Sequence, residues 1–197
     1  MDDLLFLQNL SSFTELEHCE DSFHPSHTTI SHQPIFTASA ILPNGKKISL
    51  LKSVLSSCCE NNCFYCPYRA GRDFQRYSFP PEGFAKLFMN LFHAGIVEGL
   101  FISSGVIHSG IHTQDKLITV AEILRYRYHF QGYIHLKLMP SCEKAQVEKA
   151  MAIANRVSIN LEAPNEARLR NLAPDKLFSE NLLLPLQWIQ EIRADAP

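Results

Sequence analysis

Residues 133–162 read YIHLKLMPSCEKAQVEKAMAIANRVSINLE, and this stretch decides the fold class. Tyr133–Met139 and Arg156–Glu162 have the length and apolar content of strands. Between them, Ser141 is expected to cap a helix whose apolar face carries Val147, Ala150, Met151 and Ala154. A strand, a helix and a second strand in this order form a βαβ unit. Such a unit requires a parallel pair of strands and a right-handed crossover.

The same alternation extends to both sides of this unit. Pro81 is expected to begin a helix that Gly95 ends, and Glu98–Ser104 follows as a short buried strand. Asp115 is expected to cap the next helix, which Gly132 ends. Further along, Ser179–Arg193 is predicted to form a last helix with a kink at Pro185. The sequence therefore predicts an α/β fold with a parallel sheet.

The amino-terminal part of the chain differs from this pattern. Phe36–Leu42 and Lys47–Leu55 are expected to pair as a hairpin, because Asn44-Gly45 between them supplies the positive φ angles of a tight turn. Residues 1–35 are interpreted as an extension with a short helix over Asp2–Leu16 and then a loop that holds His18, His24, His27 and His32. The predicted domains are this extension over 1–35 and a core over 36–197.

Two of the predicted strands carry polar side chains on one face. His135, Lys137 and Met139 share a face in one strand, and Ser158, Asn160 and Glu162 share a face in the next. A parallel strand covered by helices is usually apolar on both faces. We therefore expect these polar faces to line a water-filled cavity. The alternative is an exposed sheet edge with one solvated face.

Composition limits the class of protein. The chain has 197 residues, 46% of them hydrophobic and 19% charged, with a formal net charge of −2. These values exclude a disordered acidic tail, a collagen-like repeat and a strongly basic nucleic-acid binder. The sequence has no apolar run long enough to span a membrane and opens with two acidic residues rather than a basic signal region. A cytoplasmic location is therefore expected.

Four of the six cysteines lie close together. Cys59, Cys63 and Cys66 have the spacing C-x3-C-x2-C directly after a predicted strand. Short loops of this kind bring three thiolates to one centre, and soft thiolates select iron–sulfur clusters or zinc. Three ligands would leave one iron of a four-iron cluster without a protein donor. Structural zinc needs four ligands, so Cys58 or Cys142 would have to complete a zinc site. Both readings stay open at this point.

The cysteine spacing with an aromatic residue before the last cysteine resembles the signature of the radical S-adenosylmethionine (SAM) superfamily. The resemblance implies a (βα) barrel, here partial and ending after about four βα units. It implies that Cys59, Cys63 and Cys66 bind a [4Fe-4S] cluster and that SAM binds the remaining iron. It also implies SAM contacts from one residue of the cysteine motif and from residues at the ends of two later strands: Tyr65, Ser103, Ser104, Gly105, Asn160 and Glu162. An electron donor such as flavodoxin or ferredoxin is the implied redox partner.

Four blocks in order resemble one subgroup, the DNA modification/repair radical SAM proteins: LLKSVLSSCCENNCFYCPYR, EGLFISSGV, YIHLKLMP and SINLEAPNEARLRNLAP. This closer resemblance implies DNA or another nucleic acid as partner, with a glycosylase-like neighbour. It also implies a downstream DNA-binding element, so the chain is expected to be a truncated or fragmentary form. Arg69 and Arg72 either belong to an ordinary solvated face or contact an anionic substrate or the SAM carboxylate.

The remaining polar residues give no second catalytic motif. His108 and His112 are expected to be loop histidines rather than metal ligands, since no H-E-x-x-H pattern surrounds them. Lys137 and Glu162 are either paired charges in the cavity or catalytic groups, and no catalytic residue is assigned. The sequence thus leaves a radical SAM enzyme as the favoured function. A non-catalytic zinc module and an inactive remnant are the alternatives.

Overall fold

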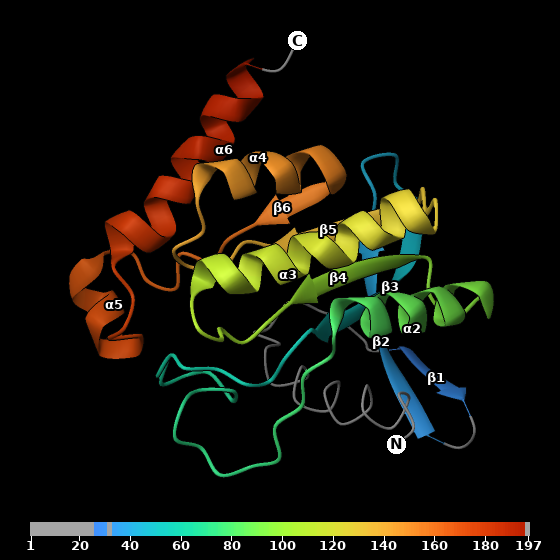
Figure 1. Cartoon of the computed structure of the whole chain (residues 1–197), viewed down its shortest axis with the longest axis horizontal. Helices are drawn as coiled ribbons and strands as arrows, with labels where there is room; N and C mark the ends of the chain where they lie inside the picture. The colour runs from blue at the N-terminus through green and yellow to red at the C-terminus, as the bar shows by residue number, and fades with distance from the viewer. Residues whose placement is uncertain (1–25, 31–32, 196–197) are drawn as a thin grey trace.

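The structure is a computed structural model that describes residues 26–30 and 33–195 (Figure 1). The helix expected over Asp2–Leu16 lies outside these residues, as do His18, His24 and His32. Residues 26–30 correct the loop expected in the extension over 1–35, because they form a strand that pairs with the following one. The division into an extension and a core remains a prediction.

One sheet runs through the described residues, with its strands in chain order. The antiparallel part is the hairpin side, in which β1 pairs with β2 and β2 with β3. The pairs β3–β4, β4–β5 and β5–β6 are parallel, which confirms the α/β prediction. The strands are β1 (Ser26–Ile30), β2 (Gln33–Ile41), β3 (Lys47–Val54), β4 (Gly99–Ser103), β5 (Tyr133–Lys137) and β6 (Arg156–Ser158).

Helices cover one face of the parallel strands. Figure 1 shows α2 (Pro81–His93), α3 (Gly110–Glu122) and α4 (Lys144–Ile153) in a layer across that face, where α3 contacts both of the others. Two further helices, α5 (Glu166–Leu172) and α6 (Leu184–Asp195), follow β6. In the described part of the chain, no helix is both long and apolar enough to cross a membrane.

The core lies between this helix layer and the sheet. Its largest fully buried side chains come from α2, α3 and the central strands: Phe84, Phe88, Leu51, Leu100, Ile102, Leu117 and Ile134. Each such side chain contributes about 1.5–3 kcal/mol through burial. The core therefore holds the parallel strands firmly, and with them the loops at their carboxyl ends.

Several helix boundaries differ from the predicted ones. Ser109, not Asp115, caps α3, and its side chain accepts a hydrogen bond from the backbone of His112. Glu143, not Ser141, caps α4 through a capping box with Gln146. In both cases a side chain closer to the true helix start satisfies the free N–H groups of the first turn.

The end of the chain is also arranged differently. The strand expected over Arg156–Glu162 stops at Ser158, and Glu162 adopts a positive φ of 63° in the loop beyond. The short helix α5 was not predicted. The predicted last helix begins as a π-helical turn over Phe178–Leu183 and continues as α6 through Pro185. This rearrangement brings residues 162–182 onto the cysteine motif.

Candidate cofactor site

The cysteine loop, residues 58–66, leaves the carboxyl end of β3 and is fixed by backbone hydrogen bonds. The Cys66 N–H donates to the Cys63 carbonyl at 2.9 Å, and the Ala70 N–H donates to Asn61 at 2.9 Å. Arg76 holds together the residues that flank this loop on both sides. Its guanidinium donates to the carbonyls of Ser57 and Tyr68, both at 2.6 Å, and to those of Arg69 and Arg72. The loop therefore has a defined backbone before any cofactor is considered.

A cavity of about 140 Å³ opens beside this loop at the carboxyl ends of β3, β4, β5 and β6. Every site residue predicted from the sequence lines it: Cys59, Cys63, Cys66, Tyr65, Ser103, Ser104, Gly105, Asn160 and Glu162. Lys137 and Met139 line it as well, which favours the cavity over the exposed edge for this part of the polar face. The roles of these residues as cluster ligands and SAM contacts remain predictions.

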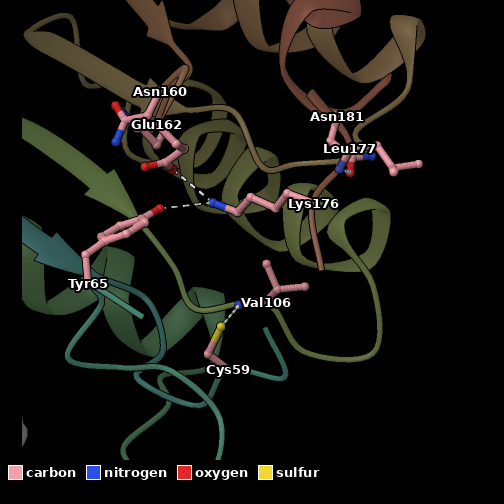
Figure 2. Close-up of polar contacts among 9 residues, drawn as sticks. Cys59, Tyr65, Val106, Asn160, Glu162, Lys176, Leu177 and Asn181 are labelled. Atoms are coloured by element: carbon pink, nitrogen blue, oxygen red, sulfur yellow. Dashed lines mark hydrogen bonds and ion pairs between the residues drawn. The ribbon is translucent and has the colours of Figure 1, made fainter. Parts of the chain in front are cut away.

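The end of β4 lies against the cysteine loop. The Gly105 N–H donates to the Ser56 carbonyl at 2.8 Å. A Cβ atom on Gly105 would lie 2.2 Å from the carbonyl oxygen of Cys58, so only glycine allows this approach. The Val106 N–H then points to the Cys59 sulfur at 3.4 Å (Figure 2). Ser103-Ser104-Gly105 is thereby placed at the wall of the cavity.

The three thiols of the motif differ in exposure. Cys63 is buried, whereas Cys59 and Cys66 are half-buried. Burial raises the pKa of the Cys63 thiol, and the nearby ammonium of Lys176 partly opposes this shift. Neither Cys58 nor Cys142 lines the cavity. Cys142 is packed in the main core, where burial raises the pKa of its thiol to about 12.

An ion pair closes one side of the cavity (Figure 2). Lys176 Nζ lies 2.9 Å from Glu162 Oε1, with the side chains only 8% and 12% exposed, and lies 3.4 Å from the Tyr65 hydroxyl. The pKa of Tyr65 is raised, because burial of its hydroxyl and the Glu162 carboxylate both disfavour the phenolate. Lys137 donates to Asn160, and the Glu162 carboxylate pairs with Lys176.

Lys176 is a residue that sequence reasoning missed. It follows α5, a helix that was not predicted, and lies far from the cysteine motif in the chain. No spacing or periodicity marks it. Only the folding of residues 162–182 onto the cysteine loop brings it to the cavity.

His135 lies outside the cavity. Its ring packs edge-on against Phe101 at 4.7 Å, and its Nε2 lies 2.8 Å from the Ser158 hydroxyl. Burial, together with the charges of Arg156 and Lys137, lowers the pKa of His135 to about 3. The polar face therefore divides into a cavity wall at its carboxyl end and a packed neutral histidine below.

The other candidate residues do not reach the cavity. Arg69 lies over the Phe64 ring at 5.7 Å, and Arg72 offers its carbonyl to Arg76. His108 and His112 are exposed, with ring centroids 5.3 Å apart. His108 is in a loop, as expected, while His112 lies in the first turn of α3.

A larger cleft of about 1210 Å³ opens at the other end of the sheet, near Tyr133 and Arg156. It contains no cysteine. We therefore place the candidate site in the smaller cavity, because the metal-binding donor type is found there.

The donor set of the smaller cavity fits an iron–sulfur cluster better than structural zinc. Three thiols line it, and the cysteines that a zinc site would need as a fourth ligand do not. Among the described residues, no three His, Cys, Asp or Glu side chains already converge at metal-coordinating geometry. The assignment therefore rests on the shared cavity and on the donor type.

The fold and site together define a partial (βα) barrel with a three-cysteine motif at the carboxyl ends of its parallel strands. Residues 53–183 match the family model of the radical SAM superfamily, and the chain belongs to that superfamily. A [4Fe-4S] cluster and SAM, the cofactors expected from the sequence, are those of its enzymes. The match is to the superfamily and does not single out the DNA modification/repair subgroup.

Solved structures agree with this fold. Methylornithine synthase (PylB) aligns with a TM-score of 0.59 at 17% identity over 73% of this chain and 42% of its own. The FeFe-hydrogenase maturase HydG from Carboxydothermus hydrogenoformans aligns with a TM-score of 0.61 at 17% identity over 73% of this chain and 33% of its own. The chain thus spans less than half the length of these structures. No match was found among curated proteins.

Proposed function

We propose that this chain is the core of a radical SAM enzyme, in which Cys59, Cys63 and Cys66 hold a [4Fe-4S] cluster and SAM binds beside them. The observation that carries the proposal is the convergence of the motif's three cysteines with the predicted SAM-contacting residues on one cavity. When bound, the cluster and SAM supply an electron and a cleavable C–S bond, which yield methionine and a 5′-deoxyadenosyl radical.

Different residues of the cavity are proposed to bind the cluster and the separate groups of SAM. The Val106 N–H donates to the Cys59 sulfur and holds this side chain at the cavity wall. Ser103 and Ser104 at the end of β4 present oxygen atoms suited to an amino group, and Lys137 holds the Asn160 side chain at the opposite wall. Asn160 and Glu162 are proposed to contact the ribose. Burial of Cys63 keeps water from one side of the cysteine loop.

Anaerobic purification with iron and sulfide reconstitution, read by electron paramagnetic resonance (EPR), tests the proposal. We expect a reduced [4Fe-4S] signal that changes on adding SAM and disappears in Cys63→Ala. Cys142→Ala is the matched control, because this buried cysteine lies outside the cavity. Zinc bound at one per chain without iron uptake would overturn the proposal in favour of the structural zinc module.

The substrate proposal is narrower and rests on the four sequence blocks alone. We propose DNA or another nucleic acid as substrate, a flavodoxin or ferredoxin as electron donor, and a glycosylase-like protein as a neighbour. Release of 5′-deoxyadenosine by the reconstituted protein, with and without single-stranded and double-stranded DNA, tests the substrate. Equal release in all three conditions would contradict a nucleic-acid substrate and leave the cofactor assignment intact.

A further inference from the structure

Residues 162–182, called here the covering segment, pack onto the cysteine loop from a distant part of the sequence. The Phe64 N–H donates to the Leu172 carbonyl at 2.7 Å, and the Asn62 N–H donates to Asp175 Oδ2 at 2.6 Å. Cys63 joins a small apolar cluster with side chains of this segment: Ala163, Leu169, Ala173 and Leu182. The covering segment therefore excludes water from one cysteine of the motif.

The covering segment also contains a buried ion pair between Lys176 and Glu162. The Lys176 and Glu162 side chains are 8% and 12% exposed and lie 2.9 Å apart. Lys176 and Cys63 line the same cavity. The ion pair with Glu162 therefore places the Lys176 ammonium at the wall of the cavity that Cys63 also lines.

Burying a charged pair is costly, and the same space could be filled by apolar side chains. The Lys176–Glu162 pair exerts its strongest electrostatic effect on the groups closest to it, because the local dielectric constant is low. Charge and hydrogen bonding around a cysteine sulfur are among the factors that set the potential of an iron–sulfur cluster. The neighbour of this pair is a predicted cluster ligand.

We propose that Lys176 is a positioning residue that makes the cluster at Cys59, Cys63 and Cys66 easier to reduce, and that Glu162 limits this effect. The inference rests on the proposed function. One-electron reduction adds a negative charge to the site. A fixed ammonium in the wall of the same cavity stabilises that charge, whereas a fixed carboxylate there opposes it. Lys176 and Glu162 therefore shift the potential in opposite directions.

The opposite signs separate this role from a purely structural one. If the pair only holds the covering segment in place, loss of either partner loosens the same contact. Both substitutions would then change the cluster in the same direction. An electrostatic role requires a lower potential without Lys176 and a higher potential without Glu162.

An EPR-monitored potentiometric titration of the reconstituted protein tests this with dithionite as the electron source. We expect Lys176→Met to reduce the one-electron equilibrium constant about tenfold, which is about 59 mV, and Glu162→Gln to increase it. Lys176→Arg keeps the charge and should stay within threefold of the wild-type chain. Lys149→Met is the matched control, because its 2.8 Å ion pair with Glu122 is on the surface.

Each outcome decides the question. Shifts of the same sign in Lys176→Met and Glu162→Gln, or shifts no larger than that of the control, overturn the proposal. If Lys176→Met does not retain a cluster, the double variant Lys176→Met/Glu162→Gln and the Glu162→Gln variant decide, since neither leaves the buried carboxylate unpaired. Failure of the wild-type chain to form a [4Fe-4S] signal would instead refute the proposed function.

Discussion

Gly105→Ala tests whether the close approach of β4 to the cysteine loop is essential to the site. The new Cβ would lie 2.2 Å from the Cys58 oxygen, where ordinary contact begins at 3.4 Å. The two backbones would have to separate by about 1.2 Å, the difference between these distances. Both sides are fixed, since the Gly105 N–H is bonded to Ser56 and the Leu55 N–H to Ser103, each at 2.8 Å.

Overpacking of this kind costs about 1–3 kcal/mol. Because the atom that is hit belongs to the backbone and cannot rotate away, we expect about 3 kcal/mol. The displacement also moves Cys59, whose Cβ would be 3.0 Å from the new methyl group. Urea unfolding gives the free energy of unfolding, and the iron-to-protein ratio after reconstitution reports the site. We expect both to fall.

Gly45→Ala is the matched control for this substitution. Gly45 has a φ of +82° and nothing within 4 Å of a new Cβ, so its cost is conformational. We expect a loss of about 1 kcal/mol in the free energy of unfolding and an unchanged iron content. Gly105→Ala with wild-type stability and full iron uptake would refute the reasoning.

Three further predictions concern Arg76 beside the cysteine loop, Leu169 in the covering segment and the half-buried His135 of β5. Arg76→Met removes the guanidinium hydrogen bonds to four carbonyls. We expect thermal and urea unfolding to show a loss of about 3 kcal/mol in the free energy of unfolding, with only partial recovery in Arg76→Lys. Full recovery in Arg76→Lys would contradict a role for the planar guanidinium. Leu169→Ala opens a cavity in the fully buried contact with Cys63 and should lower the free energy of unfolding by about 3 kcal/mol. We also expect slower iron uptake. An unchanged uptake rate would show that packing of the covering segment does not affect cofactor loading. His135 has a pKa lowered from 6.5 to about 3, so its contribution is complete above pH 6.5 and is lost as the pH falls toward 3, because the unfolded chain then binds the extra proton. Allowing for partial exposure of the ring, His135→Gln should remove about 1 kcal/mol of the stability difference between pH 7 and pH 5, and parallel pH profiles of the two proteins would count against it.

Local signals in the sequence account for most of the fold. The Asn44-Gly45 turn forms where expected, with Gly45 at a positive φ, and Pro81 occupies the first turn of α2. The apolar pattern also places β4 and β5 correctly. Helix starts were less predictable, because several polar side chains near each start compete for the cap. Ser109 and Asp115 can both accept such hydrogen bonds, and the path of the preceding loop selects Ser109.

Sequence signals likewise predict one part of the candidate site and miss another. The cysteines lie within one short loop, so their spacing alone predicts a shared centre. The pairing of Glu162 was not predictable from strand alternation, because β6 ends at Ser158 and the positive φ at Glu162 turns its side chain out of that alternation. Lys176 reaches the cavity through tertiary packing alone, which no local pattern encodes.

The contact between the covering segment and the cysteine loop also sets an order of events during synthesis. Asn62 and its partner Asp175 are 113 residues apart in the chain. At about 5–20 residues per second, a ribosome needs roughly 6 to 23 s to add that stretch. During this interval Cys63, which is 6% exposed in the finished fold, has emerged without its cover. The nascent thiols are therefore open to oxidants and stray metal ions until the last third of the chain arrives.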